Sequence, residues 1–271
     1  MLIGCCVNML PKDADDPGAW YAPEIKSAGY DYIELPIGQI VGLSASRFDE
    51  LHAYLSDVGL PVYACNNFFA SDIKLVGENV DKPRVRDFYC AVLERASILG
   101  ARYTVLGSPW SKACPQGFSP AAAFDQLTEW CIEIGDESGR YGITVALEPN
   151  NRHETNMINT FADTVLLARA ANCSKVRCLQ DYYHMRVEND TVDSLLADGK
   201  KYLVHSHFAR IDGRGFPASQ AEDVYYKTYF DALRAIGYDG GVSMEGFPRS
   251  CESFPEEAAA TCRFLKSIAN A

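Results

Sequence analysis

Residues 142–151 read GITVALEPNN, a short apolar run that ends in a carboxylate, a proline and two amides. Thr144 to Leu147 are aliphatic or β-branched and carry no charge, which is typical of a strand covered on both faces in a parallel sheet. Pro149 has no amide hydrogen to donate to a neighbouring strand, so we expect pairing to stop near Glu148. The stretch predicts a buried strand with a carboxylate at its C-terminal end. A solvated loop after a core strand would leave the same pattern, so the rest of the chain decides.

Short apolar runs alternate with longer amphipathic segments along the whole chain, the pattern of a parallel sheet covered by helices. We expect eight strands, at Ile3–Val7, Tyr32–Leu35, Val62–Ala64, Tyr103–Leu106, Thr144–Glu148, Val176–Asp181, Tyr202–His207 and Val242–Glu245. The helical segments between them lie at about Ala19–Ser27, Arg47–Val58, Val85–Leu99, Ala121–Tyr141, Phe161–Ala171, Val192–Asp198, Tyr226–Ile236 and Pro255–Ala269.

Eight such βα units predict an α/β fold, a single-domain (β/α)₈ TIM barrel over residues 1–271. A doubly wound open sheet is the alternative, but the chain has no GxGxxG after its first strand and no Walker A sequence. The expected helix exits carry glycine, where left-handed caps are common, at Gly29, Gly59, Gly100, Gly142 and Gly237. The longest irregular pieces, Asn66–Pro83 and Gly107–Pro120, predict a lid or mouth.

Composition and charge exclude several classes of protein. The chain has 271 residues, 48% of them hydrophobic, and a formal net charge of −11, which opposes a nucleic-acid partner because phosphate binding requires a basic face. No apolar run approaches the roughly 20 residues of a membrane helix. The 10 cysteines are scattered without a CxxC pair, which favours free thiols in a reducing compartment over disulfides. We therefore expect a cytoplasmic protein without a membrane or nucleic-acid partner.

Polar residues stand at the ends of four consecutive expected strands, the fifth to the eighth. In a barrel all C-terminal strand ends meet on one face, so Glu148, Asp181, His207 and Glu245 are expected to converge there. Each also has an ordinary explanation on its own: a loop residue for Glu148, a helix cap for Asp181, a satisfied core histidine for His207, and an arginine-paired carboxylate for Glu245. Those separate explanations do not predict that all four lie on the same rim.

Three buried carboxylates within a few ångströms would raise one another's pKa unless a cation lay between them. Three oxygen donors and one nitrogen, with no thiolate, favour Mn²⁺, Mg²⁺ or Co²⁺ over structural zinc. Four protein ligands leave an octahedral ion two open positions, which the carbonyl and neighbouring hydroxyl of a substrate could fill. We therefore predict one divalent metal ion held by these four residues.

These motifs carry a resemblance. The sequence LEPNNRHE from Leu147, DYYHM from Asp181, the His205-Ser206-His207 strand and IGYDG from Ile236 leading to Glu245 resemble the xylose-isomerase-like barrel superfamily and its sugar phosphate isomerase/epimerase group. Within that group they look most like the D-tagatose and D-psicose 3-epimerases. The resemblance implies one divalent ion, commonly Mn²⁺, on the four converging residues.

The resemblance also implies roles in catalysis. Glu148 and Glu245 would face each other across a substrate carbon and exchange its proton, while Glu154, His184 and Arg214 would hold the oxygens of the ketose end. The chemistry agrees, because removing a proton next to a carbonyl requires a base, and the enediolate that forms requires positive charge at its oxygen. If one carboxylate removes the proton and the opposite one returns a proton to the other face of the same carbon, the result is 3-epimerisation. Return to another carbon gives aldose–ketose isomerisation, and loss of a β-hydroxyl gives dehydration.

Some residues depart from the family pattern or stand outside it. Arg214 is displaced by one residue from the family arginine, which leaves Arg210 as a competitor, and Glu245-Gly246-Phe247 stands where Glu-Pro-Phe is frequent. Trp110 could form an aromatic wall for a sugar, with plain packing as the alternative. Further candidates for binding hydroxyls, which a loop cap would explain equally well, are Asn66, Asn67, Glu34 and Asn8.

The leading hypothesis is a divalent-metal-dependent isomerase, most simply a ketose 3-epimerase acting on a small unphosphorylated sugar. A metal-dependent lyase, dehydratase or C-glycoside deglycosidase acting on an oxo-sugar would use the same groups, and a non-catalytic barrel or subunit that binds a metal–sugar complex is the third option. An abasic-site endonuclease is disfavoured by the net charge of −11 and only 5 histidines. By family analogy we expect a homo-oligomer, a dimer or tetramer.

Overall fold

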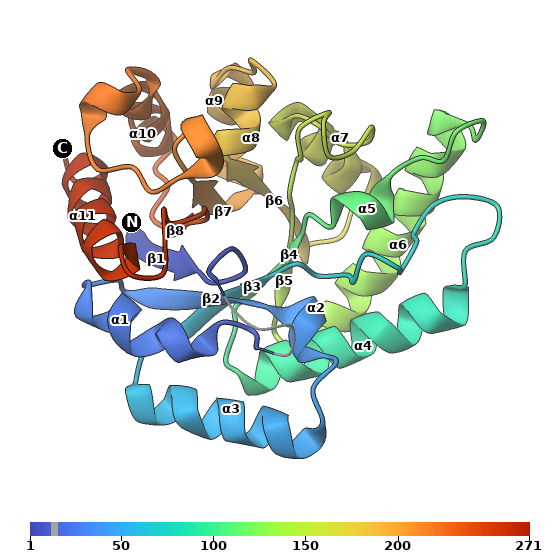
Figure 1. Ribbon diagram of the computed structural model, residues 1–271. Helices are drawn as coiled ribbons and strands as arrows, with labels where there is room; N and C mark the ends of the chain where they lie inside the picture. The colour runs from blue at the N-terminus through green and yellow to red at the C-terminus, as the bar shows by residue number, and fades with distance from the viewer. Residues whose placement is uncertain (12–15) are drawn as a thin grey trace.

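The computed structural model describes residues 1–11 and 16–271. In this part of the chain eight parallel strands pair in sequence order, and the last pairs again with the first, which closes the barrel (Figure 1). The strands are β1 (Leu2–Cys6), β2 (Tyr32–Pro36), β3 (Val62–Asn66), β4 (Tyr103–Leu106), β5 (Thr144–Leu147), β6 (Val176–Asp181), β7 (Leu203–Phe208) and β8 (Gly241–Met244). The predicted TIM barrel is confirmed, and each strand lies within two residues of its predicted bounds.

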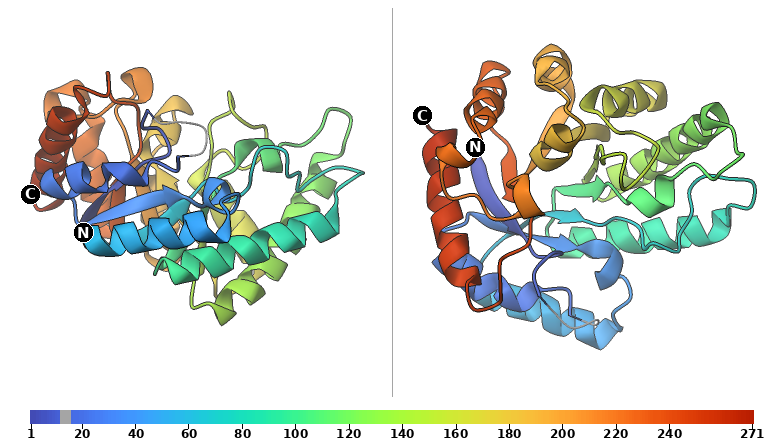
Figure 2. Two further views of the ribbon diagram at one scale, coloured as in Figure 1. Left: turned by 60° about the horizontal axis from the view of Figure 1, so that its bottom comes forward. Right: turned by 45° about the horizontal axis from the view of Figure 1, so that its top comes forward.

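Helices surround the strands, and the chain termini lie on the same side of the barrel (Figures 1 and 2). The outer helices are α1 (Ala22–Ser27, after the 3₁₀ turn Ala19–Tyr21), α3 (Ala45–Val58), α4 (Lys82–Ile98), α6 (Pro120–Arg140), α7 (Phe161–Ala171), α9 (Asp193–Tyr202), α10 (Tyr225–Ala235) and α11 (Phe254–Ala269). Short helices follow β2, β4 and β6, namely α2 (Ile37–Ile40), α5 (Pro109–Lys112) and α8 (Tyr182–Val187). No helix in the described ranges is both long and apolar enough to cross a bilayer.

The largest error in the predicted helices concerns α9, which continues to Tyr202 instead of ending at Asp198. The predicted segment ends just before Gly199. In the structure a β-carbon on Gly199 would lie 2.7 Å from Cδ1 of Ile236, so this glycine allows close packing of α9 on its neighbour. The five predicted glycine exits are confirmed, with positive φ angles of 94°, 66°, 82°, 73° and 72° at Gly29, Gly59, Gly100, Gly142 and Gly237.

The barrel has two apolar clusters, one outside the sheet and one inside it. The large cluster fills the layer between the sheet and the helices, and it includes Val145 and Leu147 of β5. A small cluster of Val105, Ala146 and Leu179 lies apart from it. Since neighbouring residues of β5 belong to different clusters, the strand buries one face against helices and the other inside the barrel. The functional side chains stand one step above this small interior cluster.

Candidate metal and active site

Successive side chains of a strand point to opposite faces, so every second residue of a barrel strand points into the barrel. Residues one step below the rim that face the interior are Ala146, Leu179 and Ser243. The residues two positions later, Glu148, Asp181 and Glu245, therefore face the interior as well.

The structure brings together the four residues that the sequence singled out as metal ligands. One ligand atom from each of Glu148, Asp181, His207 and Glu245 lies within 4.8 Å of the others. Nδ1 of His207 is 3.0 Å from Oε1 of Glu148 and 3.1 Å from Oε2 of Glu245. All four side chains are buried. Three carboxylates and one imidazole at this spacing fit a divalent cation of the hard or borderline class.

Arg214 also reaches this cluster. Its Nη2 donates to Oδ2 of Asp181 at 3.0 Å and to Oε2 of Glu245 at 2.7 Å. Arg210 instead donates to the backbone oxygen of Asp212 near the surface. Of the two arginines that the sequence left in competition, Arg214 is the one that faces the site.

Burial and neighbouring charges shift the cluster's pKa values in opposite directions. Burial, with the charges of Glu245 and Glu148, raises the pKa of Asp181 to about 7 although Arg214 opposes the shift. Burial alone would raise the pKa of Glu245, but the charges of His207 and Arg214 outweigh it and hold that pKa below its usual range. Burial alone would lower the pKa of His207, but the negative charges of Glu34 and Glu245 outweigh burial and raise that pKa. When no cation is bound, Asp181 therefore carries a proton more readily than Glu245 does.

A cavity of about 400 Å³ opens above the cluster. Six of the site residues predicted from the sequence line this cavity, namely Glu148, Glu154, His184, Arg214, Trp110 and Glu245. The loops after β3 and β4, which were predicted to form a lid or mouth, also line the cavity. The first contributes Asn67 and Phe69 to Ser71, and the second contributes Ser108 to Ser111. Trp110 is 60% exposed at this opening. The volume is typical of a site for a small metabolite.

His184 has its ring orientation fixed by a residue that the sequence reasoning missed. The backbone N–H of Asn151 donates to Nδ1 of His184 at 3.2 Å, which favours the neutral tautomer with its proton on Nε2. Nε2 lies 3.5 Å from Oδ2 of Asp181 and 3.9 Å from Oε2 of Glu154. Burial and the charge of Arg214 lower the pKa of His184 well below its usual value. His184 can therefore donate a hydrogen bond without carrying a charge, and its neighbour Asn151 stands in the same Glu-Pro-Asn-Asn motif as Glu148.

Lys112 is a second residue that the sequence reasoning missed. Its side chain is buried, and Nζ donates to the backbone oxygen of Glu148 at 2.7 Å. Burial lowers its pKa to about 8 against the opposing charges of Glu148 and Glu154. The lysine thus supports the peptide that carries Glu148. A lysine within an irregular segment gives no sequence signal for burial, because lysines in loops are ordinarily solvated.

Of the polar residues expected to bind hydroxyls, Asn8 lines the cavity, whereas Asn66 and Glu34 do not. Asn66 is buried and donates from Nδ2 to Oε1 of Glu245 at 3.3 Å, without lining the cavity. Asn8 lines the cavity and donates to the same oxygen at 2.8 Å. The interpretation of Glu34 as a sugar contact is wrong, since its carboxylate is fully buried and paired with His205 and His207. β2 continues to Pro36, two residues beyond Glu34, so this carboxylate lies inside the barrel below the rim.

Gly246 allows the loop after β8 to lie directly against the backbone of Arg214. Phe247 N donates to the backbone oxygen of Arg214 at 2.8 Å, and a β-carbon on Gly246 would lie 2.2 Å from that oxygen. Arg214 itself has a positive φ of 46°. The loops after β7 and β8 therefore pack backbone against backbone, which fixes where the guanidinium enters the site.

We predict that Gly246→Ala weakens substrate binding and leaves the barrel folded. The added methyl group must push the Arg214 turn outward, so we expect KM to rise about tenfold, the cost of one misplaced contact of roughly 1–2 kcal/mol. Gly139→Ala on α6 is the matched control, because its β-carbon meets nothing closer than 3.7 Å. Steady-state kinetics and thermal melting of both variants measure the effect, and an unchanged KM in Gly246→Ala would contradict this account of the loop.

Comparison with known proteins agrees with this geometry. Residues 23–268 match the family model described as "Xylose isomerase-like TIM barrel". The chain belongs to this family. Among characterised proteins, this member of the xylose isomerase-like family is 28% identical over 231 residues to 3-dehydro-D-guloside 4-epimerase of Escherichia coli, covering 82% of this chain and 84% of that protein. It is 26% identical over 255 residues to ketose 3-epimerase of Arthrobacter globiformis, covering 92% and 85%.

Solved structures of sugar epimerases show the same fold. D-psicose 3-epimerase from Clostridium cellulolyticum, crystallised with D-tagatose, superposes with a TM-score of 0.87 at 20% identity, and the match covers 99% of each chain. The apo form of 3-keto-D-glucoside 4-epimerase from E. coli gives a TM-score of 0.78 at 25% identity and covers 98% of this chain and 99% of that one. The resemblance drawn from the strand-end motifs is thereby confirmed.

Proposed function

We propose that this protein is a divalent-metal-dependent sugar epimerase of the isomerase class, and specifically a ketose 3-epimerase. The observation that carries the proposal is the placement of Glu148 and Glu245, which come from the ends of β5 and β8 and line one cavity while sharing one ligand cluster. Two carboxylates on one cavity supply the base and the acid that epimerisation requires. Characterised relatives that are sugar epimerases support the isomerase class.

The proposed roles follow from the contacts of each side chain. A divalent ion held by Glu148, Asp181, His207 and Glu245 would polarise the substrate carbonyl and stabilise the charge that develops on its oxygen. One of the two glutamates removes the proton at C3, and the other returns a proton to the opposite face. His184 donates its Nε2–H to a substrate oxygen, while Arg214 and Glu154, whose Nη1 and Oε1 are 3.7 Å apart, hold neighbouring hydroxyls. Trp110 covers the apolar face of the sugar at the mouth.

Exchange of solvent deuterium into ketoses tests the proposal. The metal-loaded protein, incubated in D₂O with a panel of free ketoses, is expected to incorporate one deuterium at C3 and to form the 3-epimer. NMR of the recovered sugars locates the label, because deuterium at C1 or C2 of an aldose would instead indicate isomerisation. If no ketose of the panel exchanges while the ion is bound, the ketose epimerase and isomerase proposals both fail, and an oxo-sugar substrate or a binding barrel is left.

A second candidate is the same proton chemistry on an oxo-sugar that carries a further group. The outer wall of the cavity includes Met9, Phe69 and Trp110, apolar side chains that could pack against a glycosidic substituent. The guloside 4-epimerase of E. coli, a relative over most of the chain, acts by its name on a glycoside. Adding 3-oxo-glycosides to the panel separates the outcomes: a 4-epimer identifies this candidate, and a product lacking its leaving group identifies a lyase or deglycosidase.

Three finer points belong to the same proposal. We propose Mn²⁺ as the ion, with Mg²⁺ and Co²⁺ as alternatives, on the basis of three carboxylates and one imidazole. We propose the cytoplasm as the compartment, since all ten cysteines are free, as a reducing environment would keep them. We propose a homo-oligomer, either a dimer or a tetramer, by analogy with the family, and sedimentation velocity measures it.

A further inference from the structure

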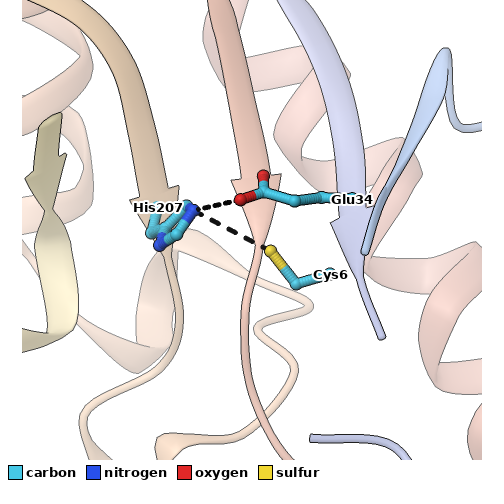
Figure 3. Close-up of side chains that lie close together, drawn as sticks. All are labelled: Cys6, Glu34 and His207. Carbon is cyan, nitrogen blue, oxygen red and sulfur yellow. Dashed lines mark hydrogen bonds and ion pairs between the residues drawn. The ribbon is translucent and has the colours of Figure 1, made fainter. Parts of the chain in front are cut away.

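Beneath the ligand cluster lies a second group of polar side chains that the proposed mechanism leaves without a role. It consists of Cys6 at the end of β1, Glu34 on β2 and the underside of His207 on β7 (Figure 3). All three are buried, and neither Cys6 nor Glu34 lines the cavity. Neither side chain therefore reaches a sugar in the cavity, and the ligand residue that both contact is His207.

The two nitrogens of His207 face different partners. Nε2 lies 2.9 Å from Oε1 of Glu34, while Nδ1 lies 3.0 Å from Glu148 and 3.1 Å from Glu245. A carboxylate beside Nε2 favours the proton there, which leaves the lone pair of Nδ1 free for a cation. Cys6 is the other neighbour of Nε2, and its Sγ is 3.9 Å away, the limit of a weak contact with sulfur. Of these two neighbours, Glu34 makes the stronger interaction.

Glu34 is itself held rigidly from its other oxygen. Oε2 accepts from Ser243 Oγ at 2.6 Å and lies 2.7 Å from Nε2 of His205, and Tyr32 OH is 2.8 Å from the Ser243 hydroxyl. Both carboxylate oxygens are thus used, and the side chain has no free rotation. A charged group held this firmly in a buried position fixes the ring that it contacts.

We propose that Glu34 is a positioning residue for the metal centre: it holds His207 as the Nε2–H tautomer, so that Nδ1 points into the carboxylate cluster as a ligand. The inference rests on the proposed metal site and extends it by one contact, from the cavity down to β2. Its consequence is a change in metal affinity, because outer carboxylates of this kind orient the ligand and raise its basicity.

Metal affinity of Glu34→Gln tests the inference. The amide keeps the size of the side chain and can still accept from one histidine, but it loses the charge. We expect the variant to bind Mn²⁺ about 10- to 100-fold more weakly in isothermal titration of the metal-free protein. Cys6→Ala is the matched control on the same nitrogen, and we expect its affinity to change less than about twofold, as for the loss of one weak contact. A purely structural role for Glu34 would lower the melting temperature of the metal-free protein and leave the affinity unchanged.

The wild-type protein provides a measurement that does not depend on the variant folding. Long-range ¹⁵N–¹H spectra of the protein loaded with Zn²⁺, a diamagnetic ion, are expected to show His207 protonated at Nε2. A proton on Nδ1, or equal affinities of Glu34→Gln and wild type, would overturn the inference. Failure of the wild-type protein to bind any divalent ion is a different result, because it would remove the proposed metal site itself.

Discussion

Glu245→Gln is expected to abolish turnover and to leave the barrel folded. The carboxylate has two proposed roles, since it faces the cavity and also contributes a ligand atom to the cluster. Glutamine cannot accept the substrate proton and is a poorer ligand, so we expect kcat to fall by about 10³-fold or more, within the range that a single general acid or base supplies. The measurement is kcat on the sugar that the wild-type protein converts, beside thermal melting and metal analysis of the same preparation.

Metal content separates the two roles of Glu245. If Glu245→Gln retains one equivalent of metal and loses turnover, the proton-transfer role is isolated. If the metal is lost as well, activity is measured again at saturating Mn²⁺. Glu50→Gln serves as the control for the substitution itself, because Glu50 is an exposed carboxylate on α3 that pairs with Arg47 and Ser46 of its own helix. Near-normal turnover in Glu245→Gln would remove the two-carboxylate mechanism.

The barrel could be predicted from the sequence because its signals are local and repeated. An apolar run such as Thr144 to Leu147 marks a strand, and a glycine such as Gly142 marks the end of the helix before it. Eight βα units in one chain leave few other architectures. Convergence of the four strand-end residues then follows from topology alone, since a closed parallel barrel gathers its C-terminal strand ends. Much of the candidate site could therefore be named before the structure was known.

The parts that could not be predicted depend on depth and on contacts between loops. Glu34 and Glu148 each follow apolar strand residues, yet Glu34 lies inside β2, 0% exposed and paired with histidines, while Glu148 stands just past β5 and lines the cavity. Lys112 is buried in a four-residue helix, too short to show a 3.6-residue period. Arg214 enters the site because Gly246 admits its backbone, a contact between residues 32 positions apart (246 − 214). None of these features leaves a local pattern.

Removal of the metal ion is expected to stop turnover, and the affinity for the ion should depend steeply on pH. Dialysis against a chelator should reduce activity to background, and Mn²⁺ should restore it. Burial raises the pKa of Asp181 to about 7, so below that pH an incoming ion must displace a proton from its carboxyl. The raised pKa of His207 acts in the same direction, whereas Glu245, whose pKa is lowered, is already ionised. Affinity should therefore rise with pH, by up to about tenfold per unit for each proton released below pH 7.

Stability gives an independent check of the same linkage. A carboxyl whose pKa is raised on folding contributes stability at low pH that is lost as pH rises through its folded value. The metal-free protein should therefore lose stability between about pH 4 and pH 7 on account of Asp181, and bound metal should offset more of that loss as pH rises. Thermal melting with and without Mn²⁺ at pH 5, 6, 7 and 8 should show a difference in Tm that widens as pH rises, through about pH 7 because of Asp181 and further because of the raised pKa of His207. In Asp181→Asn the dependence should flatten, because the titrating carboxyl is gone; a slope equal to that of the wild type would assign the released proton to another group.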